Sequence, residues 1–310
     1  VEQSLKHRHG LNGKGLFERK KQIIKDSLYG VEVKEWAVWI CQLRLWLSLF
    51  VDAPDELKNS LEPILPSLDF KVRQGDSLVQ RVGSKAFPVS GHNIGLSKAL
   101  KDKITKLKSL KLQYFDNKSD LKEGELREIE LAIYKEILDT EISEKSFELS
   151  NLKNIKPAKT LSLFGETEIQ AELELDKDKI ISLEQEIADL EEQKMALHKD
   201  KPLVWSIEFA DVFGEKGGFD IIIGNPPYVR QEDIADPTRR VKDKKEYKSY
   251  LQEMVRIDFP NDFSPKLKLN AQSDLYTYFY IRGLRLLNRS GIHTFICSNS
   301  WLDVGYGAWL

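Results

Sequence analysis

The residues best suited to chemistry form one short run, Asn225-Pro226-Pro227-Tyr228, directly after the apolar segment Phe219–Gly224. Two prolines fix φ and remove two backbone donors, so the loop is stiff and its carbonyls point outward. The Asn225 amide oxygen and the Pro226 carbonyl then form paired acceptors for both hydrogens of a planar exocyclic amine or amide nitrogen. A nitrogen held in this way can attack an electrophilic methyl group. Tyr228 offers a face on which the ring that carries this nitrogen can stack. An ordinary Asn-Pro turn is the alternative, and the strand ahead of it favours the chemical interpretation.

Two acidic residues stand at the ends of predicted strands. Glu32 lies at the end of Leu28–Val33, and Asp76 follows the alternating segment Phe70–Gly75. An acid at a strand end can bind both hydroxyls of a ribose, which makes Glu32 a candidate for that role. Asp76 is a candidate acceptor for an adenine amine. The ordinary alternatives are a solvated strand end for Glu32 and a turn or helix cap for Asp76.

The segments that must position these residues alternate between strand and helix patterns. Helices are predicted at Glu35–Phe50 and Asp274–Leu287, and a further strand at His293–Cys297. This alternation predicts an α/β fold with a doubly wound, mostly parallel sheet. Ligands bind such sheets at the carboxyl ends of the strands, which is where Glu32, Asp76 and Asn225 stand.

Two of the predicted elements carry strong apolar patterns. The segment Phe219–Gly224 has the continuous apolar pattern of a buried strand. The predicted helix at Glu35–Phe50 places four apolar residues along one face, Trp36, Ile40, Leu43 and Leu47. The tryptophans Trp36, Trp39 and Trp46 are predicted to lie in the core.

Composition divides the chain into residues 1–95, 96–202 and 203–310. The outer segments are predicted to form one sheet domain, and the Lys/Glu/Leu-rich middle segment an inserted helical hairpin or coiled coil. Its two long helices are predicted from apolar steps, and Lys111 interrupts the first of them: Leu100, Ile104, Leu107, Tyr114, Leu126, Ile129, Ile133 and Ile137, then Ile180, Leu183, Ile187, Leu190 and Leu197. A solvated hairpin and an arm that grips DNA or a partner both remain open.

Charge and cysteine content narrow the possible classes. Lys and Arg number 47 against 49 Asp and Glu, so any nucleic-acid contact must come from a local patch. Cys41 and Cys297 are too few and too far apart for a disulfide framework or a four-ligand zinc site. No metal site is predicted, since the His7-x-His9 pair has no third ligand nearby. No membrane span or signal peptide is recognised, which favours the cytoplasm.

A basic cluster follows the Asn-Pro-Pro-Tyr run. It could contact DNA phosphates, or it could be an ordinary charged surface helix. Its members are Arg239, Arg240, Lys242, Lys244 and Lys245.

Taken in order, these motifs resemble the gamma-class DNA adenine-N6 methyltransferases, especially the methylase modules of combined (type IIG-like) restriction–modification and phage-defence enzymes. The resemblance covers both flanks and not the helical insert. The stretches that carry it are Leu28-Tyr-Gly-Val-Glu-Val-Lys-Glu-Trp-Ala-Val, Leu43-Arg-Leu-Trp-Leu-Ser-Leu49, Gln74-Gly-Asp-Ser-Leu78, Phe219-Asp-Ile-Ile-Ile-Gly-Asn-Pro-Pro-Tyr-Val229, Asp274-Leu-Tyr-Thr-Tyr-Phe and Ser298-Asn-Ser-Trp-Leu302.

The resemblance implies S-adenosylmethionine as methyl donor, with Glu32 on its ribose and Asp76 near its adenine. It implies that Asn225, with its prolines Pro226 and Pro227 and with Tyr228, holds an adenine flipped out of double-stranded DNA. Asn225 would also border the donor, and the helix that begins at Asp274 would wall the donor pocket.

The sequence departs from this family pattern at both ends. The only glycine-rich candidate near the start, Gly10-Leu-Asn-Gly13-Lys-Gly15, has no strand ahead of it and is interpreted as an ordinary loop. We therefore expect the family's glycine-rich donor loop to lie upstream and a target-recognition domain downstream, with a nuclease domain possible in the same polypeptide. On this expectation the 310 residues alone would be inactive.

Two rival functions remain. The same acceptor geometry serves methyltransferases that act on a protein glutamine amide or an RNA guanine amine. A non-catalytic interaction fragment, in which the hairpin bridges subunits, is the rival of another class.

Overall fold

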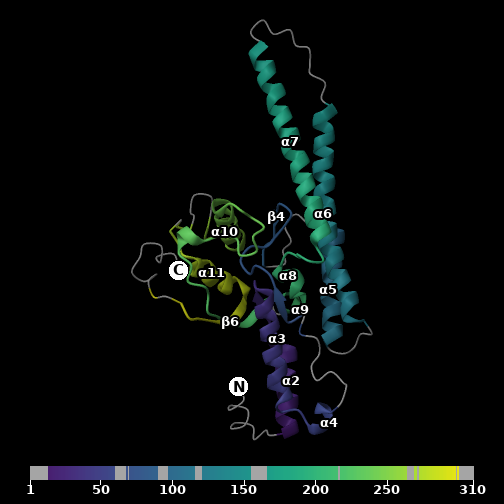
Figure 1. Cartoon of the computed structure of the whole chain (residues 1–310), viewed down its shortest axis with the longest axis vertical. Coiled ribbons are helices and arrows are strands. Elements are labelled where there is room, and N and C mark those ends of the chain that lie inside the picture. Colours follow the sequence, from purple (N-terminus) through teal and green to yellow (C-terminus); the bar gives the residue numbers. More distant parts are fainter. Residues whose placement is uncertain are drawn as a thin grey trace. The chain divides into compact units, whose positions relative to one another are not determined.

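A computed structural model of the chain describes residues 13–59, 68, 70–89, 97–115, 121–154, 166–215, 217–263, 269–270, 272–297 and 299. The chain forms two compact units (Figure 1). The first comprises Val1–Gln80, Ala86–Leu126 and Leu203–Leu310, and the second comprises Arg81–Lys85 and Arg127–Pro202. The boundaries 1–95, 96–202 and 203–310 stay a prediction. No helix in the described ranges is long and apolar enough to cross a membrane.

The first unit is built from helices and short strands. In chain order they are α2 (Gly13–Ser27), β1 (Gly30–Glu32), α3 (Glu35–Phe50), α4 (Asp55–Lys58), β2 (Val72–Gln74), α5 (Lys98–Phe115), α8 (Trp205–Glu208), α9 (Ala210–Glu215), β5 (Phe219–Gly224), the 3-10 turn η1 (Gln231–Asp233), α10 (Lys244–Asp258), α11 (Leu275–Leu286) and β6 (Leu287–Phe295). A short hairpin, β3 (Arg81–Val82) and β4 (Lys85–Ala86), belongs to the second unit as far as Lys85, and the chain then returns to the first unit.

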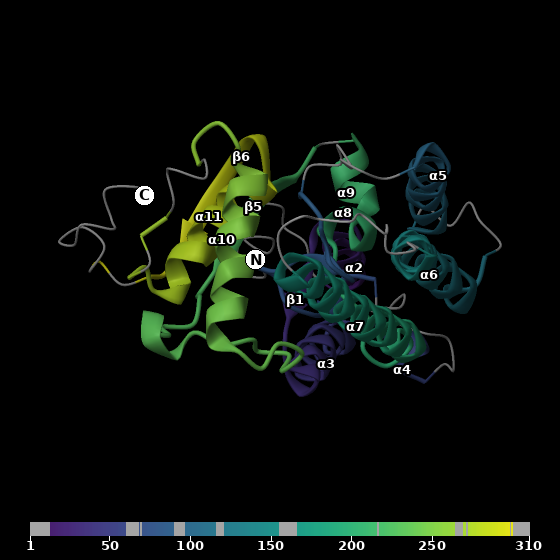
Figure 2. The ribbon, with the colours of Figure 1, turned by 90° about the horizontal axis from the view of Figure 1, so that it is seen from above.

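Both strand pairs of the first unit are parallel, which confirms the mixed α/β prediction. Glu32 of β1 pairs with Gln74 of β2, and Gly224 of β5 pairs with Phe295 of β6. Helix α11 lies against β5 and β6 (Figure 2). In the described part of the chain the two pairs are separate two-stranded sheets, so a single doubly wound sheet stays a prediction.

Two burial predictions were wrong. Helix α3 forms where predicted, but Trp36, Trp39 and Trp46 are 62%, 59% and 38% exposed, and its buried residues include Val38 and Leu49. Twelve of the sixteen positions of α3 are apolar, so its pattern indicates a helix without fixing which face is buried.

Strand β5 is not buried on both faces either. Ile221 and Ile223 are exposed, while Phe219 and Ile222 pack into the core. Strand β6 also begins earlier than predicted, at Leu287. Gly291 lies within it, at a point where β5 approaches closely. A Cβ at Gly291 would lie 2.9 Å from the Phe219 carbonyl oxygen, so the close approach of β5 requires a glycine there.

The glycine-rich segment near the start is not the loop that was predicted. Gly13 and Gly15 lie in the first turn of α2. Residues 10–12, His7 and His9 lie outside the described residues.

In the part that the structure describes, the middle segment contains three helices rather than two. Helix α5 belongs to the first unit and packs on α9. Helix α5 also contacts α8. Lys111, a residue of the predicted seam, fixes this second contact, because its buried ammonium donates to the carbonyls of Ile207 (3.0 Å) and Glu208 (2.7 Å) in α8. A lysine that binds the last carbonyls of a helix satisfies acceptors that have no partner within that helix.

The second unit is an antiparallel pair of helices, α6 (Glu123–Asn154, from Arg127 on) and α7 (Glu166–Ala196). Three ion pairs join the two helices, Asp139–Lys194, Lys145–Glu186 and Glu148–Lys179. Residues further along α6 pair with residues earlier in α7, so the two helices run in opposite directions. The predicted seam residues Leu183, Leu190 and Leu197 are buried, as are Ile133 and Ile137. A coiled coil stays a prediction.

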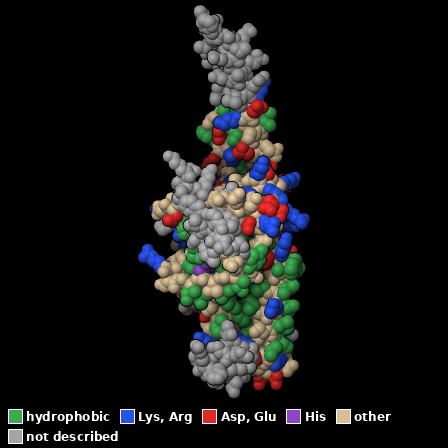
Figure 3. All heavy atoms as spheres, turned by 90° about the vertical axis from the view of Figure 1, so that its left-hand side faces the viewer, with side chains coloured by type: hydrophobic (Ala, Val, Ile, Leu, Met, Phe, Trp, Pro, Cys, Tyr) green, Lys and Arg blue, Asp and Glu red, His purple; other side chains and the backbone are tan. Residues whose placement is uncertain are grey.

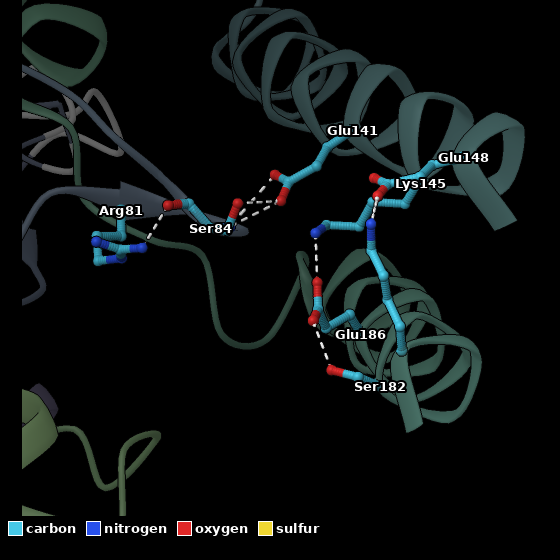
Figure 4. Close-up of polar contacts among 8 residues, drawn as sticks. Arg81, Ser84, Glu141, Lys145, Glu148, Ser182 and Glu186 are labelled. Atoms are coloured by element: carbon cyan, nitrogen blue, oxygen red, sulfur yellow. Dashed lines mark hydrogen bonds and ion pairs between the residues drawn. The ribbon is translucent and has the colours of Figure 1, made fainter. Parts of the chain in front are cut away.

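The β3–β4 turn is fixed to α6 within this unit. Ser84 donates its hydroxyl and its backbone N–H to the buried carboxylate of Glu141 (Figure 4). Gly83 has φ +61°, and a Cβ there would collide with Glu141 and Leu190. The turn therefore needs glycine on two grounds, its left-handed backbone and its lack of space.

We expect Gly83→Ala to destabilise the second unit by about 2 kcal/mol, because it adds backbone strain and displaces Glu141. Urea unfolding followed by circular dichroism measures this. Gly124→Ala, at the start of α6 just before the second unit resumes at Arg127, is the control for the substitution itself, since a Cβ there meets no neighbour within 4 Å. Equal stabilities for the two variants would contradict the expectation.

A buried lysine gives the first unit a pH-dependent stability. Burial lowers the pKa of Lys71 to about 8, and the nearby Asp211 carboxylate (3.9 Å) only partly offsets this. The unfolded chain therefore binds more protons than the folded chain between pH 8 and 10, so this lysine makes stability rise with pH. We expect about 2 kcal/mol more stability at pH 10 than at pH 8 from this group. Urea titrations of wild type and Lys71→Met check it, and a rise that survives in the variant would contradict it.

Candidate functional site

The Asn-Pro-Pro-Tyr loop begins where β5 ends at Gly224. Asn225 is exposed and Pro226 is buried. Tyr228 is 56% exposed, yet its hydroxyl donates to the Ile296 carbonyl at 3.0 Å, just beyond β6. The ring is therefore fixed at its tip and largely open to solvent, as a stacking surface requires.

The far end of the loop is fixed to the start of α11. The Leu275 N–H donates to the Val229 carbonyl at 3.0 Å, and the Gln231 N–H donates to the Asp274 carboxylate at 2.9 Å. The helix predicted from Asp274 thus forms, and its first residues position the loop.

The two predicted acids end neighbouring strands. Glu32 is exposed, and its carboxylate accepts from the Lys34 N–H at 3.0 Å. The Gly75 N–H donates to the Glu32 carbonyl at 3.0 Å, so the turn that carries Asp76 begins beside Glu32. The parallel pairing of β1 and β2 therefore brings these acids to one end of a sheet.

Asp76 forms a structured turn. One of its oxygens accepts from the Leu78 N–H (2.8 Å) and the other from the Tyr247 hydroxyl (2.7 Å). Burial raises its pKa, against the lowering effect of these two bonds, and burial beside Asp76 also raises the pKa of Tyr247. The turn role is what the structure shows. A bond to an adenine amine stays a prediction.

Arg282 of α11 connects the Asp76 turn to the rest of the first unit. Its buried guanidinium donates to the Leu78 carbonyl (2.6 Å) and pairs with Asp258 of α10 (2.5 Å). Asp258 in turn accepts from the Val89 N–H. The sequence analysis missed this pair, although a charged residue within the apolar Tyr278–Leu286 stretch was a signal.

One hydrophobic cluster supports both halves of the site. Leu78 beside Asp76 and Val229 of the loop both pack into it, together with Leu275. Tyr247 and Tyr278 fill its centre, and Gln252 donates to the Tyr278 hydroxyl at 2.8 Å. The Asp76 turn and the Asn-Pro-Pro-Tyr loop are thus held by the same core.

The basic cluster is exposed at all five positions, Arg239, Arg240, Lys242, Lys244 and Lys245. The first three precede α10, and the two others start it. Buried Asp236 shapes this turn by accepting from the Thr238 and Val241 N–H groups at 2.7 and 2.8 Å. Arg239 has φ 64°, so the turn holds its backbone in a conformation that residues other than glycine seldom adopt.

Comparison with known proteins gives the family context. The chain is 25% identical over 326 residues to a putative type II restriction enzyme and methyltransferase, RM.MjaORFECS2P of Methanocaldococcus jannaschii, with 92% of this chain and 23% of that protein covered. It is 34% identical over 92 residues to the type II methyltransferase M.PaeR7I of Pseudomonas aeruginosa, covering 30% of this chain and 12% of that protein.

The chain therefore spans less than a quarter of the length of these two relatives. No solved structure matches it. The profile of the Eco57I restriction-modification methylase family matches residues 26–310, which include every site residue described above. This match over most of its length places the chain in the Eco57I restriction-modification methylase family.

Proposed function

We propose that this chain is the methyl-transfer part of a DNA methyltransferase that methylates the N6 amine of adenine within a restriction–modification or phage-defence system. The observation that carries the proposal is the exposed Asn-Pro-Pro-Tyr loop at the end of a parallel strand, anchored at both ends. In this proposal Asn225 and the Pro226 carbonyl hold the amine of an extruded adenine. Tyr228 stacks on its ring.

The donor would be S-adenosylmethionine, which supplies an electrophilic methyl group when bound. The acids at the ends of β1 and β2 fit such a nucleoside, because Glu32 is exposed and can accept from ribose hydroxyls. Asp76 follows the next strand, β2, and would lie near the donor's adenine. The chain's own contribution is orientation of the amine, whose proton leaves to solvent after transfer.

The basic cluster supports double-stranded DNA as partner. Arg239, Arg240 and Lys242 would contact phosphates near the extruded base, and Lys244 and Lys245 would extend that contact along α10. The family match favours DNA over the rival substrates, a protein glutamine amide and an RNA guanine amine.

The proposal is tested with the full-length protein and labelled S-adenosylmethionine, offered DNA, ribosomal RNA or a release factor. We expect label only in DNA, as N6-methyladenine in the nucleoside digest. Label in cytosine, RNA or protein would overturn the assignment of the acceptor. Absence of donor binding by calorimetry would favour the non-catalytic rival.

Tyr228→Phe separates the two roles of Tyr228. The ring remains while the hydroxyl bond to Ile296 is lost, so we expect the methylation rate to fall less than about tenfold. Tyr228→Ala removes the stacking surface and should cost about a hundredfold. Single-turnover rates on one DNA duplex measure both, and equal losses would show that the ring itself contributes nothing.

A further inference from the structure

Helix α10 carries a buried tyrosine whose hydroxyl reaches the Asp76 turn. Tyr247 is 2% exposed, and its hydroxyl donates to one oxygen of the Asp76 carboxylate at 2.7 Å. Its ring packs in the same hydrophobic cluster as Leu78, so apolar contacts hold the ring beside the turn. A hydrogen bond from a side chain that is itself fixed by packing orients the group that accepts it. Tyr247 therefore holds the Asp76 carboxylate in one orientation.

The same helix begins inside the basic cluster. Asp243 caps α10 by accepting from the Lys245 N–H at 2.9 Å, and the Tyr247 N–H donates to the Asp243 carbonyl at 3.1 Å. Lys244 and Lys245 are the first two residues of the helix, and both are exposed. Although the net charge of the chain is only −2, Lys and Arg side chains gather locally, as at mid-height on the right of the face shown in Figure 3. Tyr247 thus lies within one helical turn of two lysines that we propose for DNA phosphates.

Charged groups act on Asp76 from three sides. Burial raises the pKa of Asp76, the Tyr247 hydroxyl and backbone N–H groups of its own turn lower it, and the Asp236 carboxylate ahead of α10 raises it. On α11, burial lowers the pKa of Arg282, and the Asp258 and Asp76 carboxylates oppose this. An ionised carboxylate accepts a hydrogen bond from an amine more strongly than a protonated one. The bond from Tyr247 is therefore one of the contacts that keep Asp76 in the form suited to an adenine amine.

We propose that Tyr247 is a positioning residue that couples donor binding to DNA binding. It holds the Asp76 carboxylate towards the adenine amine of the donor, and it does so from the helix whose start contacts the DNA backbone. DNA bound at the basic cluster fixes the start of α10 and with it Asp76, so each ligand strengthens the binding of the other by the same factor. The inference rests on the proposed function, which supplies the roles of Asp76 and of the basic cluster.

Calorimetry on the full-length protein measures this coupling. The ligand is S-adenosylhomocysteine, which keeps the adenine of the donor but lacks the methyl group, so that no turnover occurs. In wild type, a DNA duplex that the protein methylates should tighten its binding at least about fivefold. In Tyr247→Phe, binding without DNA should weaken about tenfold, and the tightening by DNA should fall below about twofold. Equal tightening in the two proteins would overturn the proposal.

The pH dependence of binding separates positioning from folding. Without the Tyr247 hydroxyl, Asp76 takes up its proton at a higher pH, so the loss of ligand affinity on acidification should begin at a higher pH than in wild type. Tyr250→Phe is the matched control, because the Tyr250 hydroxyl donates to the Glu246 carboxylate within α10 and removing it leaves the Asp76 turn intact. A profile that stays in place in Tyr247→Phe, or that moves equally in Tyr250→Phe, contradicts the positioning role.

A second variant tests the DNA side of the coupling without touching the core. Lys244→Gln combined with Lys245→Gln changes two exposed positions at the start of α10. At saturating DNA, the tightening of S-adenosylhomocysteine binding should fall below about twofold, as in Tyr247→Phe, because the duplex no longer fixes this end of the helix. If the double variant keeps the tightening of wild type, DNA does not act through α10 and the proposal is wrong.

The wild-type protein distinguishes a failure of this inference from a failure of the proposed function. If wild type binds no S-adenosylhomocysteine, or if its DNA product contains no N6-methyladenine, the proposed function is wrong. If wild type passes both tests and its coupling survives in Tyr247→Phe, only the role of Tyr247 is wrong.

Discussion

Asn225→Ala in the full-length protein is expected to lower the methylation rate at least about a thousandfold while leaving donor binding within about twofold. The amide oxygen is one of the two acceptors that we propose for the amine, and the truncation leaves that amine unoriented. Asn225 is exposed, so its loss creates no cavity and should not affect folding. Single-turnover methylation and calorimetry with S-adenosylmethionine measure the two effects.

Asn288→Ala is the matched control for this experiment. Asn288 lies on β6, and its amide donates to Asp220 of β5 at 2.6 Å, so it borders the same strand without belonging to the loop. Retained methylation in Asn225→Ala would refute the proposed role. An equal loss in Asn288→Ala would mean that disturbance of β5, and not the loss of an acceptor, explains the effect.

The second large effect is expected at Arg282. Arg282→Met should destabilise the first unit by about 3–5 kcal/mol, because it leaves the buried Asp258 carboxylate unpaired and removes a donor from the Leu78 carbonyl. Chemical denaturation followed by near-ultraviolet circular dichroism measures this. Arg289→Met, at an exposed position on β6, should change stability by less than about 0.5 kcal/mol.

A double variant separates the ion pair from simple packing. Arg282→Met combined with Asp258→Leu removes both charges, so it should recover part of the stability that Arg282→Met loses. If the double variant loses as much stability as Arg282→Met and Asp258→Leu lose separately when added together, the pair is not coupled and Arg282 acts through packing alone.

Local patterns predicted the strands and helices that carry the candidate site because their causes are local. The apolar run Phe219–Gly224 predicted β5 with the bounds that the structure has, and Glu35–Phe50 predicted α3. The prediction of a loop at Gly13 and Gly15 was wrong. Two glycines within a Lys-rich stretch do not prevent a helix once Phe17 is buried against its neighbours.

Long-range partners could not be predicted in this way. Tyr247 stands 171 residues from Asp76, and Leu78 stands 204 residues from Arg282. Lys111 looked like an interruption of an apolar seam, and it is instead the attachment of α5 to α8. Each of these polar side chains is explained by an acceptor or donor that only the folded chain brings near.

The sequence by itself determined that the Asn-Pro-Pro-Tyr loop follows a strand, that two acids stand at strand ends and that the fold is of a parallel α/β class, because residue type and spacing act over a few positions. Only the tertiary structure decided which apolar faces are buried. Burial depends on what else packs nearby, so the tryptophans of α3 and the isoleucines of β5, apolar by sequence, lie exposed in this chain.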